Sequence, residues 1–202
     1  TYPETTLQLL ALVHTILQPG IGDDDAAARE ARRAAEAFEA EQAPGEAAEA
    51  WFLLAQAEVA ATGSPSAETL EAARHAAERS GREEIALRVA VLADDVALAE
   101  GTLPSTAGLT VRIDRAYHLG LHEVADASRT QEAERMLLVS DAQGARAALA
   151  SHGLLRRAHP FASVRAARVD ARAATALGDT SAAISGLRRV VSRLDAWAGD
   201  LP

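Results

Sequence analysis

The stretch AARVDARAATALGDTSAAISGLRRVVSRL, residues 166–194, carries the pattern that decides the fold. Its midpoint is the dipeptide Gly178-Asp179, in which a glycine ends one helix and an aspartate caps the next. Alanine, the best helix former, fills much of the first half. Apolar residues recur in the second half at steps of four and three: Ala183, Leu187 and Val190. This spacing is typical of an amphipathic helix, so the stretch predicts two helices joined by a tight turn.

Similar start and stop signals recur along the rest of the chain. Glycine or proline ends most of the periodic segments, and serine, aspartate or proline opens the next. Ser64-Pro65 is interpreted as a cap followed by proline at the first helical position. Helices are expected at 3–18, 24–42, 44–62, 65–80, 82–100, 105–119, 121–140, 141–153, 160–177 and 179–197. About ten helices with short connections favour stacked antiparallel hairpins over a single four-helix bundle.

Composition indicates an all-α protein with an unusual core. Alanine supplies about a quarter of the residues, aromatics only 3%, and strand-favouring residues are sparse. Apolar residues make up 49%, which allows a sizeable core built from small side chains. We expect one domain spanning 1–202, and we interpret it as a fragment of a longer protein because it starts at Thr1 and stops at Pro202 just after a helix.

The sequence has no cysteine, and all 20 of its basic residues are arginine. Without lysine there is no Walker-type phosphate loop and no Schiff base, and without cysteine there is no thiol nucleophile, thiolate metal site or disulfide. No Gly-x-Ser-x-Gly elbow is present either. We therefore expect a protein that is not an enzyme and needs no cofactor. The Ala, Arg and Gly bias is typical of a GC-rich bacterial genome, and the missing cysteine fits a cytoplasmic location.

The net charge of the chain is −9. A protein that binds nucleic acid needs a dense basic surface to displace counterions, so this charge disfavours nucleic acid as a partner. No run of residues approaches the 18 apolar positions of a membrane span. We therefore expect neither nucleic acid nor a membrane among the partners.

Two predicted helices differ in how much of their surface is apolar. The helix at 82–100 has apolar residues on all sides, which predicts burial on most sides and a place in the middle of the stack. The last helix, 179–197, has an apolar stripe and a polar face. It is interpreted either as the final helix of the array or as one that packs on a missing part. The stripe comprises Ala183, Leu187, Val190, Val191, Leu194 and Trp197.

The hairpin at 166–194 resembles a tetratricopeptide repeat, a family with two helices in about 34 residues. Ala171 matches the small residue that lets the partner helix approach, and Gly178-Asp179 matches the turn. Ala183, Leu187 and Val190 match the second-helix positions, although Val190 is larger than the usual alanine. Weaker matches occur at 141–149 and at 51–63, where Glu58 lies near the position of the consensus aromatic.

The resemblance implies an architecture and a class of function. It implies antiparallel hairpins stacked into a right-handed superhelix, with a concave face, lined by the first helix of each pair, that binds peptides or proteins. Similar Ala- and Arg-rich repeat segments flank enzymatic or regulatory domains in large bacterial signalling proteins. We therefore expect a protein- or peptide-binding scaffold in a bacterial regulatory or signalling protein, and the partner can be another domain of the same chain.

Three arginines form the best candidate binding site. Arg165, Arg168 and Arg172 occupy positions i, i+3 and i+7, so they share one face of the helix at 160–177. Arginine grips carboxylates with two hydrogen bonds, which makes an acidic peptide or a C-terminal carboxylate a suitable ligand. The alternative is a solvated face whose arginines pair with acidic neighbours.

Two alternatives to peptide binding remain open at this stage. A ligand pocket between helices predicts a small-molecule-sensing domain. His118 and His122 have the spacing of metal ligands on one continuous helix, and Asp126 lies four residues further on. This spacing is the basis of the second alternative, a metal-dependent enzyme. Gly120 between the histidines indicates a helix break that points them apart, and we therefore predict no metal site.

Overall fold

The computed structural model describes residues 24–151 and 160–199, and all regular elements in these ranges are helices. The all-α expectation is therefore confirmed. The helix expected at 3–18 lies outside the described residues. The chain divides into two compact units, Thr1–Val96 and Ala97–Pro202. The interpretation of 1–202 as one repeat domain stays a prediction.

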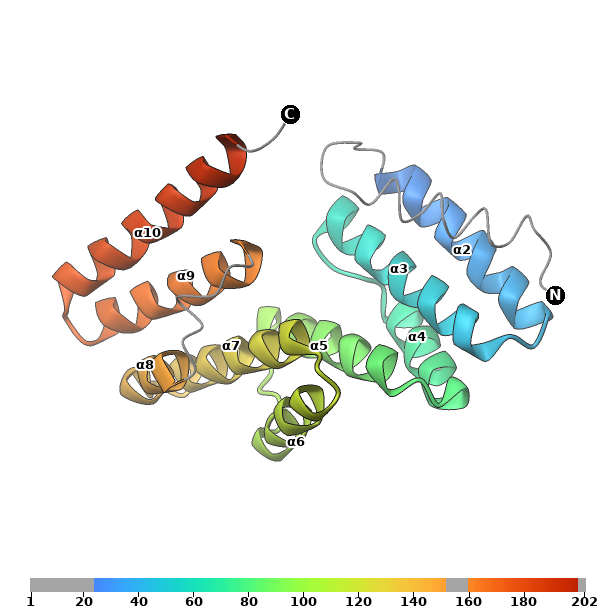
Figure 1. The fold of residues 1–202 in the computed structure, drawn as a ribbon, viewed down its shortest axis with the longest axis horizontal. Coiled ribbons are helices and arrows are strands. Elements are labelled where there is room, and N and C mark those ends of the chain that lie inside the picture. The colour runs from blue at the N-terminus through green and yellow to red at the C-terminus, as the bar shows by residue number, and fades with distance from the viewer. Residues whose placement is uncertain (1–23, 152–159, 200–202) are drawn as a thin grey trace. The chain divides into compact units, whose positions relative to one another are not determined.

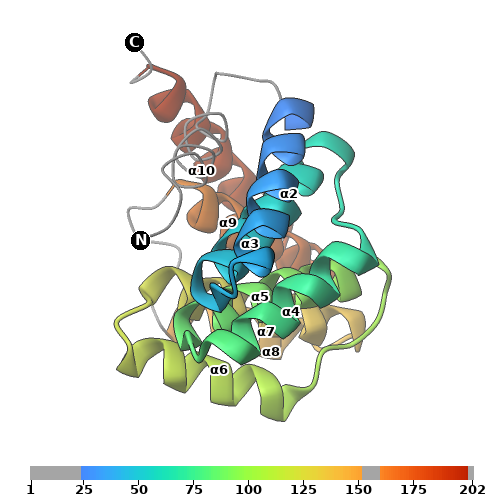
Figure 2. The same ribbon diagram turned by 90° about the vertical axis from the view of Figure 1, so that its right-hand side faces the viewer.

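The first unit is organised around one central helix. It contains α2 (Asp24–Ala40), α3 (Pro44–Thr62), α4 (Ala67–Ser80) and most of α5 (Glu83–Ala99). α3 packs against α2 on one side and α4 on the other (Figures 1 and 2). Alanine dominates the core, and Trp51 and Phe38 are its largest buried side chains. Small side chains allow this close approach of helices, as the composition predicts.

The prediction that the helix at 82–100 is buried on most sides is wrong. In α5 only Ile85 and Val89 are buried, and the other apolar residues of the predicted set are partly exposed. The enclosed helix is α3, which has eight buried residues, most of them alanine. α3 is enclosed because its alanines let both neighbouring helices approach, whereas periodicity alone does not reveal which helix has neighbours on both sides.

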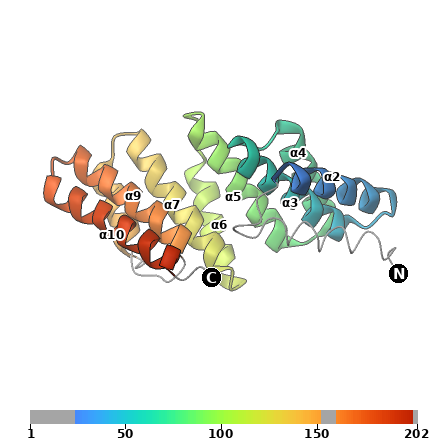
Figure 3. The same cartoon turned by 90° about the horizontal axis from the view of Figure 1, so that it is seen from above.

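The second unit is a series of helices in which sequence neighbours pack together. It contains α6 (Thr106–His118), α7 (His122–Leu138), α8 (Ala142–Ser151), α9 (Pro160–Ala176) and α10 (Thr180–Gly199). α9 and α10 lie side by side (Figures 1 and 3), and α7 also contacts α9. One apolar cluster joins three of these helices: Ala133 of α7, Ala142, Ala145 and Leu149 of α8, and Ala166, Val169 and Ala173 of α9.

The helices repeat at a nearly constant interval. The first helices of successive pairs begin at Pro44, Glu83, His122 and Pro160, which are 39, 39 and 38 residues apart. The second helices, α4, α6, α8 and α10, follow each of them after a short connection. Helix starts therefore repeat along the described chain from α3 onward with a period longer than the 34 residues of a tetratricopeptide repeat, and α3 with α4, α7 with α8 and α9 with α10 pack as pairs.

Most predicted helix ends agree with the structure, but the start of α4 differs. Gly63 and Gly81 end α3 and α4 in the left-handed conformation that favours glycine. The cap of α4 is Ser66, whose hydroxyl accepts a hydrogen bond from the Thr69 amide, so the interpretation of Ser64 as cap and Pro65 as first helical residue is wrong. The reason lies in α3, where the Glu58 carboxylate accepts hydrogen bonds from the Ser66 amide at 2.7 Å and the Thr69 hydroxyl at 2.9 Å.

α9 and α10 approach closely because both helices have small residues where they meet. A Cβ atom added to Gly186 would lie 3.3 Å from the Cβ of Ala171, which is the small residue of the predicted hairpin. Ala183 and Gly186 are buried in this contact. Within the predicted apolar stripe of α10, Ala183 is buried, whereas Leu187 and Val191 are exposed. The side chains of Leu194 and Trp197 lie outside the described residues.

Membrane insertion was not expected from the sequence. None of the helices in the described ranges combines the length and the apolar character needed to cross a bilayer.

Candidate functional site

The exposed side chains that the structure describes on α9 share one face, and the predicted arginines lie on it. The residues on its other sides are buried, mainly alanines together with Val169 and Asp170. Arg168 and Arg172 are exposed, and Arg165 is half-buried. Because α9 packs against α7, α8 and α10, its backbone is held on several sides. The arginine side chains therefore project from a firmly supported helix.

Arg165 forms an ion pair with a residue of α7, the first helix of the preceding pair. Its guanidinium binds both carboxylate oxygens of Glu134 in α7, with Nη2–Oε2 2.6 Å and Nε–Oε1 3.3 Å. The Glu134 side chain is only 12% exposed, so this ion pair is shielded from solvent on one side. Two-point contacts of this kind are the strong form of the arginine–carboxylate interaction. Arg165 thus follows the alternative interpretation, pairing with an acidic neighbour.

Arg168 and Arg172 differ from Arg165 in having no such partner. Within the described ranges neither guanidinium forms an ion pair or a hydrogen bond. The two residues are four apart, so their side chains are neighbours on the exposed face. The only acidic residue of α9, Asp170, is buried on another side of the helix. This face therefore presents two arginines that can together take a carboxylate from outside the chain.

Asp170 was not identified from the sequence, and it fixes the position of α9. Its carboxylate is 7% exposed and accepts hydrogen bonds from Arg146 of α8 at 3.1 Å and Arg189 of α10 at 3.4 Å. Arg146 also pairs with Asp179 at the start of α10. Asp170 therefore joins three helices. The sequence did contain one signal for this role, because Asp170 is an acidic residue on a helix face that otherwise consists of alanine.

A second buried polar group lies between α6 and α7. Arg112 is 7% exposed and donates hydrogen bonds to the Ser128 hydroxyl at 2.8 Å and the Gln131 amide oxygen at 2.9 Å. Arg129 lies over the ring of Tyr117, with its guanidinium carbon 4.4 Å from the ring centre. These contacts bind α6 to α7 through paired polar groups rather than through apolar packing alone.

The structure separates the two histidines of the metal hypothesis. His118 ends α6 and His122 begins α7, and Gly120 between them has a φ of 72°, as its predicted role as a helix break requires. Both histidines are exposed, whereas Asp126 is buried. His122 packs against the edge of the Tyr117 ring. No group of three or more potential metal-ligating side chains occurs within the described part of the chain.

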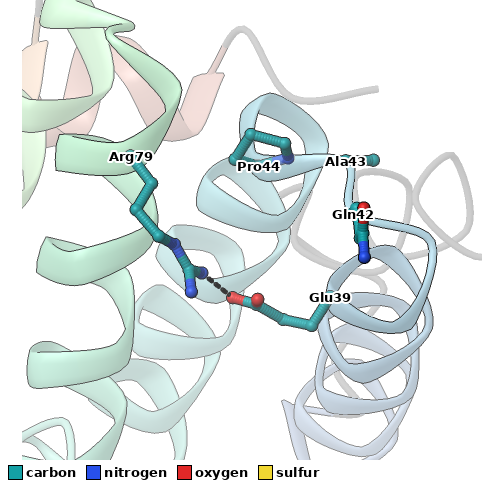
Figure 4. Close-up of a pocket in the computed structure, with 5 residues that line it drawn as sticks. All are labelled: Glu39, Gln42, Ala43, Pro44 and Arg79. Atoms are coloured by element: carbon teal, nitrogen blue, oxygen red, sulfur yellow. Dashed lines mark hydrogen bonds and ion pairs between the residues drawn. The ribbon is translucent and has the colours of Figure 1, made fainter.

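A small pocket lies in the first unit, where α2 turns into α3 beside the end of α4 (Figure 4). Its volume is about 260 Å³. The lining residues are Glu39, Gln42, Ala43, Pro44 and Arg79. The Arg79 guanidinium forms an ion pair with the Glu39 carboxylate across one side of the pocket (Figure 4). The pocket is smaller than the 300–1,000 Å³ that is typical of small-molecule sites.

Comparison with known proteins adds no relative to this geometry: no protein-family model, curated protein or solved structure matches the chain.

Proposed function

We propose that this chain is a non-catalytic protein- or peptide-binding scaffold, in which the exposed face of α9 binds an acidic peptide segment or a C-terminal carboxylate. The observation that carries the proposal is the pair Arg168 and Arg172, two exposed guanidiniums without an acidic partner within the described ranges. Hydrogen bonds to a charged group contribute about 1.5–3 kcal/mol, so two arginines can support a specific contact.

The repeated hairpins support a scaffold architecture for this function. Rows of paired helices bury one face against their neighbours and leave the first helices of successive pairs next to one another. The Arg165–Glu134 contact joins two such first helices, α9 and α7. We propose that the hairpins form a right-handed superhelix similar to that of tetratricopeptide repeats. The protein then acts in the bacterial cytoplasm within a regulatory or signalling protein, and its partner is an acidic protein segment, which can belong to the same chain.

The proposal is tested with a library of acidic peptides ending in free carboxylates. The double variant Arg168→Ala/Arg172→Ala is expected to bind the selected peptides at least about tenfold more weakly than the parent, because about 1.4 kcal/mol of lost contact energy corresponds to a factor of ten. Binding is measured by fluorescence anisotropy at low and physiological salt. The loss is expected to shrink as salt rises, since exposed charges are screened.

The matched control is Arg29→Ala/Arg88→Ala. Both arginines are exposed on other helices and form no ion pair in the described ranges, so this variant loses the same charge elsewhere. It is expected to bind like the parent. Equal binding by the α9 double variant and this control would remove the α9 face from the site.

A second function has one observation in its favour, the pocket at Glu39 and Arg79. Its opposed charges suit a small zwitterionic ligand, whose carboxylate would meet the arginine and whose ammonium would meet the glutamate. Thermal shift measurements with amino acids test this small-molecule-sensing alternative. A saturable rise in melting temperature that disappears in Arg79→Gln supports it, and an unchanged melting temperature with every amino acid rejects it.

A further inference from the structure

α10 carries an apolar face that no other described helix covers. Ile184, Leu187 and Val191 are 46%, 51% and 55% exposed. They occupy positions i, i+3 and i+7, so they share one face, and it differs from the face on which Ala183 and Gly186 meet α9. We call these three residues the α10 apolar face. The other exposed residues of α10 include Ser185, Arg188, Arg189 and Ser192, so its remaining described surface is largely polar.

The equivalent face of α8 shows what normally covers such a surface in this chain. Asp141 and Asp179 cap α8 and α10, each accepting a hydrogen bond from the amide three residues later. From these caps, Leu149 occupies in α8 the position that Leu187 occupies in α10. Leu149 is fully buried beneath Ala166, Val169 and Ala173 of α9, whereas Leu187 is half exposed. The α10 apolar face therefore corresponds in position to the surface of α8 that α9 covers.

The charges beside this face indicate the chemistry of its partner. The described side chains of α10 include Arg188 and Arg189 but no acidic residue. A second copy of α10 would place arginine beside arginine, which disfavours self-pairing. In α8 the position equivalent to Ile184 is Arg146, which pairs with Asp170 of α9. A helix suited to α10 therefore has an apolar residue where α9 has Asp170.

We propose that the α10 apolar face is a docking site for an amphipathic helix of a partner protein. That helix has small and apolar residues on its contact face and Asp or Glu along the edges of this face. It packs on α10 as α9 packs on α8, with its acidic edge toward Arg188. This site is separate from the Arg168 and Arg172 face and goes beyond peptide binding there.

A designed peptide provides the probe. It has the sequence of α9, residues 160–176, with Asp170→Leu to meet Ile184 and with Arg165→Glu and Arg172→Glu to supply acidic edges. The second peptide keeps both arginines and is otherwise identical. Binding to the 202-residue chain is measured in the Arg168→Ala/Arg172→Ala background, so that the α9 face does not contribute. The acidic peptide is expected to bind saturably and about tenfold more tightly than the basic one at low salt.

Two further substitutions test whether the acidic peptide binds at the α10 apolar face. Leu187→Glu is expected to weaken binding of the acidic peptide more than tenfold, with unchanged helix content because Leu187 is already half exposed. Val111→Glu places the same charge at another exposed apolar residue, 68% exposed on α6, and is expected to leave binding unchanged. Equal binding by Leu187→Glu and Val111→Glu, or by the acidic and basic peptides, overturns the proposal. Self-association of the chain that Leu187→Glu abolishes also overturns it, since a second copy then covers the face.

Discussion

At the scale of single residues, several polar side chains determine how the helices meet. Glu58 accepts hydrogen bonds from Ser66 and Thr69 and lies 3.5 Å from the Arg32 guanidinium, so one carboxylate connects α3 with α2 and with the start of α4. The hairpin resemblance identified Glu58 only as a departure from a consensus aromatic. Its partners are Ser66 and Thr69, 8 and 11 positions later in the chain, and Arg32, 26 positions earlier. Helical periodicity does not reveal contacts at these separations.

Removing this carboxylate should destabilise the first unit. Glu58→Ala leaves the buried Thr69 hydroxyl and the Ser66 amide without their acceptor, and we expect a loss of about 2 kcal/mol in the free energy of unfolding. Urea denaturation followed by circular dichroism measures it. Glu71→Ala, which removes exposed pairings with Arg74 and His75 within α4, should cost no more than about 0.5 kcal/mol. Comparable losses in the two variants would contradict the role of Glu58.

Glu84 provides a test of the local electrostatics. The hydrogen bond from Arg82 Nε, 2.7 Å long, lowers the pKa of the Glu84 carboxyl below its ordinary value, and a backbone hydrogen bond adds to this. Because the folded-state pKa is lowered, the resulting stabilisation is present above the ordinary glutamate pKa and is lost as pH falls through the folded-state value. The contribution is small, since both side chains are well exposed to solvent.

The measurement is a carboxyl NMR titration. Glu84 should titrate at lower pH in the parent than in Arg82→Gln, in which its pKa should return toward that of an ordinary glutamate. An unchanged Glu84 titration in the variant would show that the arginine does not cause the shift.

At the scale of elements, the size of the side chains controls how closely two helices approach. The contact between α9 and α10 has Ala171 facing Gly186, as the small residue in the predicted hairpin required. The resemblance of residues 166–194 to a tetratricopeptide repeat predicts a small residue at Ala171 but makes no prediction for Gly186. The glycine matters because a Cβ atom there would lie 3.3 Å from the Ala171 Cβ, which is a tight contact between two helices.

A branched residue at Gly186 should therefore force α9 and α10 apart. We expect Gly186→Val to lower the free energy of unfolding by about 1–3 kcal/mol, because overpacking displaces neighbouring atoms. Thermal denaturation provides the measurement. Ser185→Val adds a similar branched side chain at an exposed position of the same helix and should have a much smaller effect. Equal stability of the two variants would show that the contact has room for a larger residue.

At the scale of the whole molecule, the net charge of −9 is distributed unevenly over the helices. α9 has three arginines and one acidic residue, and that acidic residue is buried between two further arginines. A local basic surface can therefore exist on an acidic protein. We expect the overall negative charge to favour small acidic groups over a long polyanion as partners of such a surface.

Nucleic acid should accordingly fail to bind at physiological salt. Fluorescence anisotropy with labelled single- and double-stranded DNA is expected to show no saturable binding at about 0.15 M ionic strength, where the Debye length is about 8 Å. The acidic peptides that bind the parent chain provide the positive control. Saturable DNA binding that the Arg168→Ala/Arg172→Ala variant loses would instead identify the α9 face as a nucleic-acid site.

The sequence by itself determined the helices and most of their ends, because capping, glycine stops and apolar periodicity act between residues a few positions apart. It also brought Arg165, Arg168 and Arg172 onto one face, since that depends only on helical spacing. The tertiary structure decided which of them is paired, through Glu134 at a separation of 31 residues. It also decided that Leu149 is buried while Leu187 is exposed. Burial and pairing depend on which helices become neighbours, and that involves contacts between residues far apart in the chain.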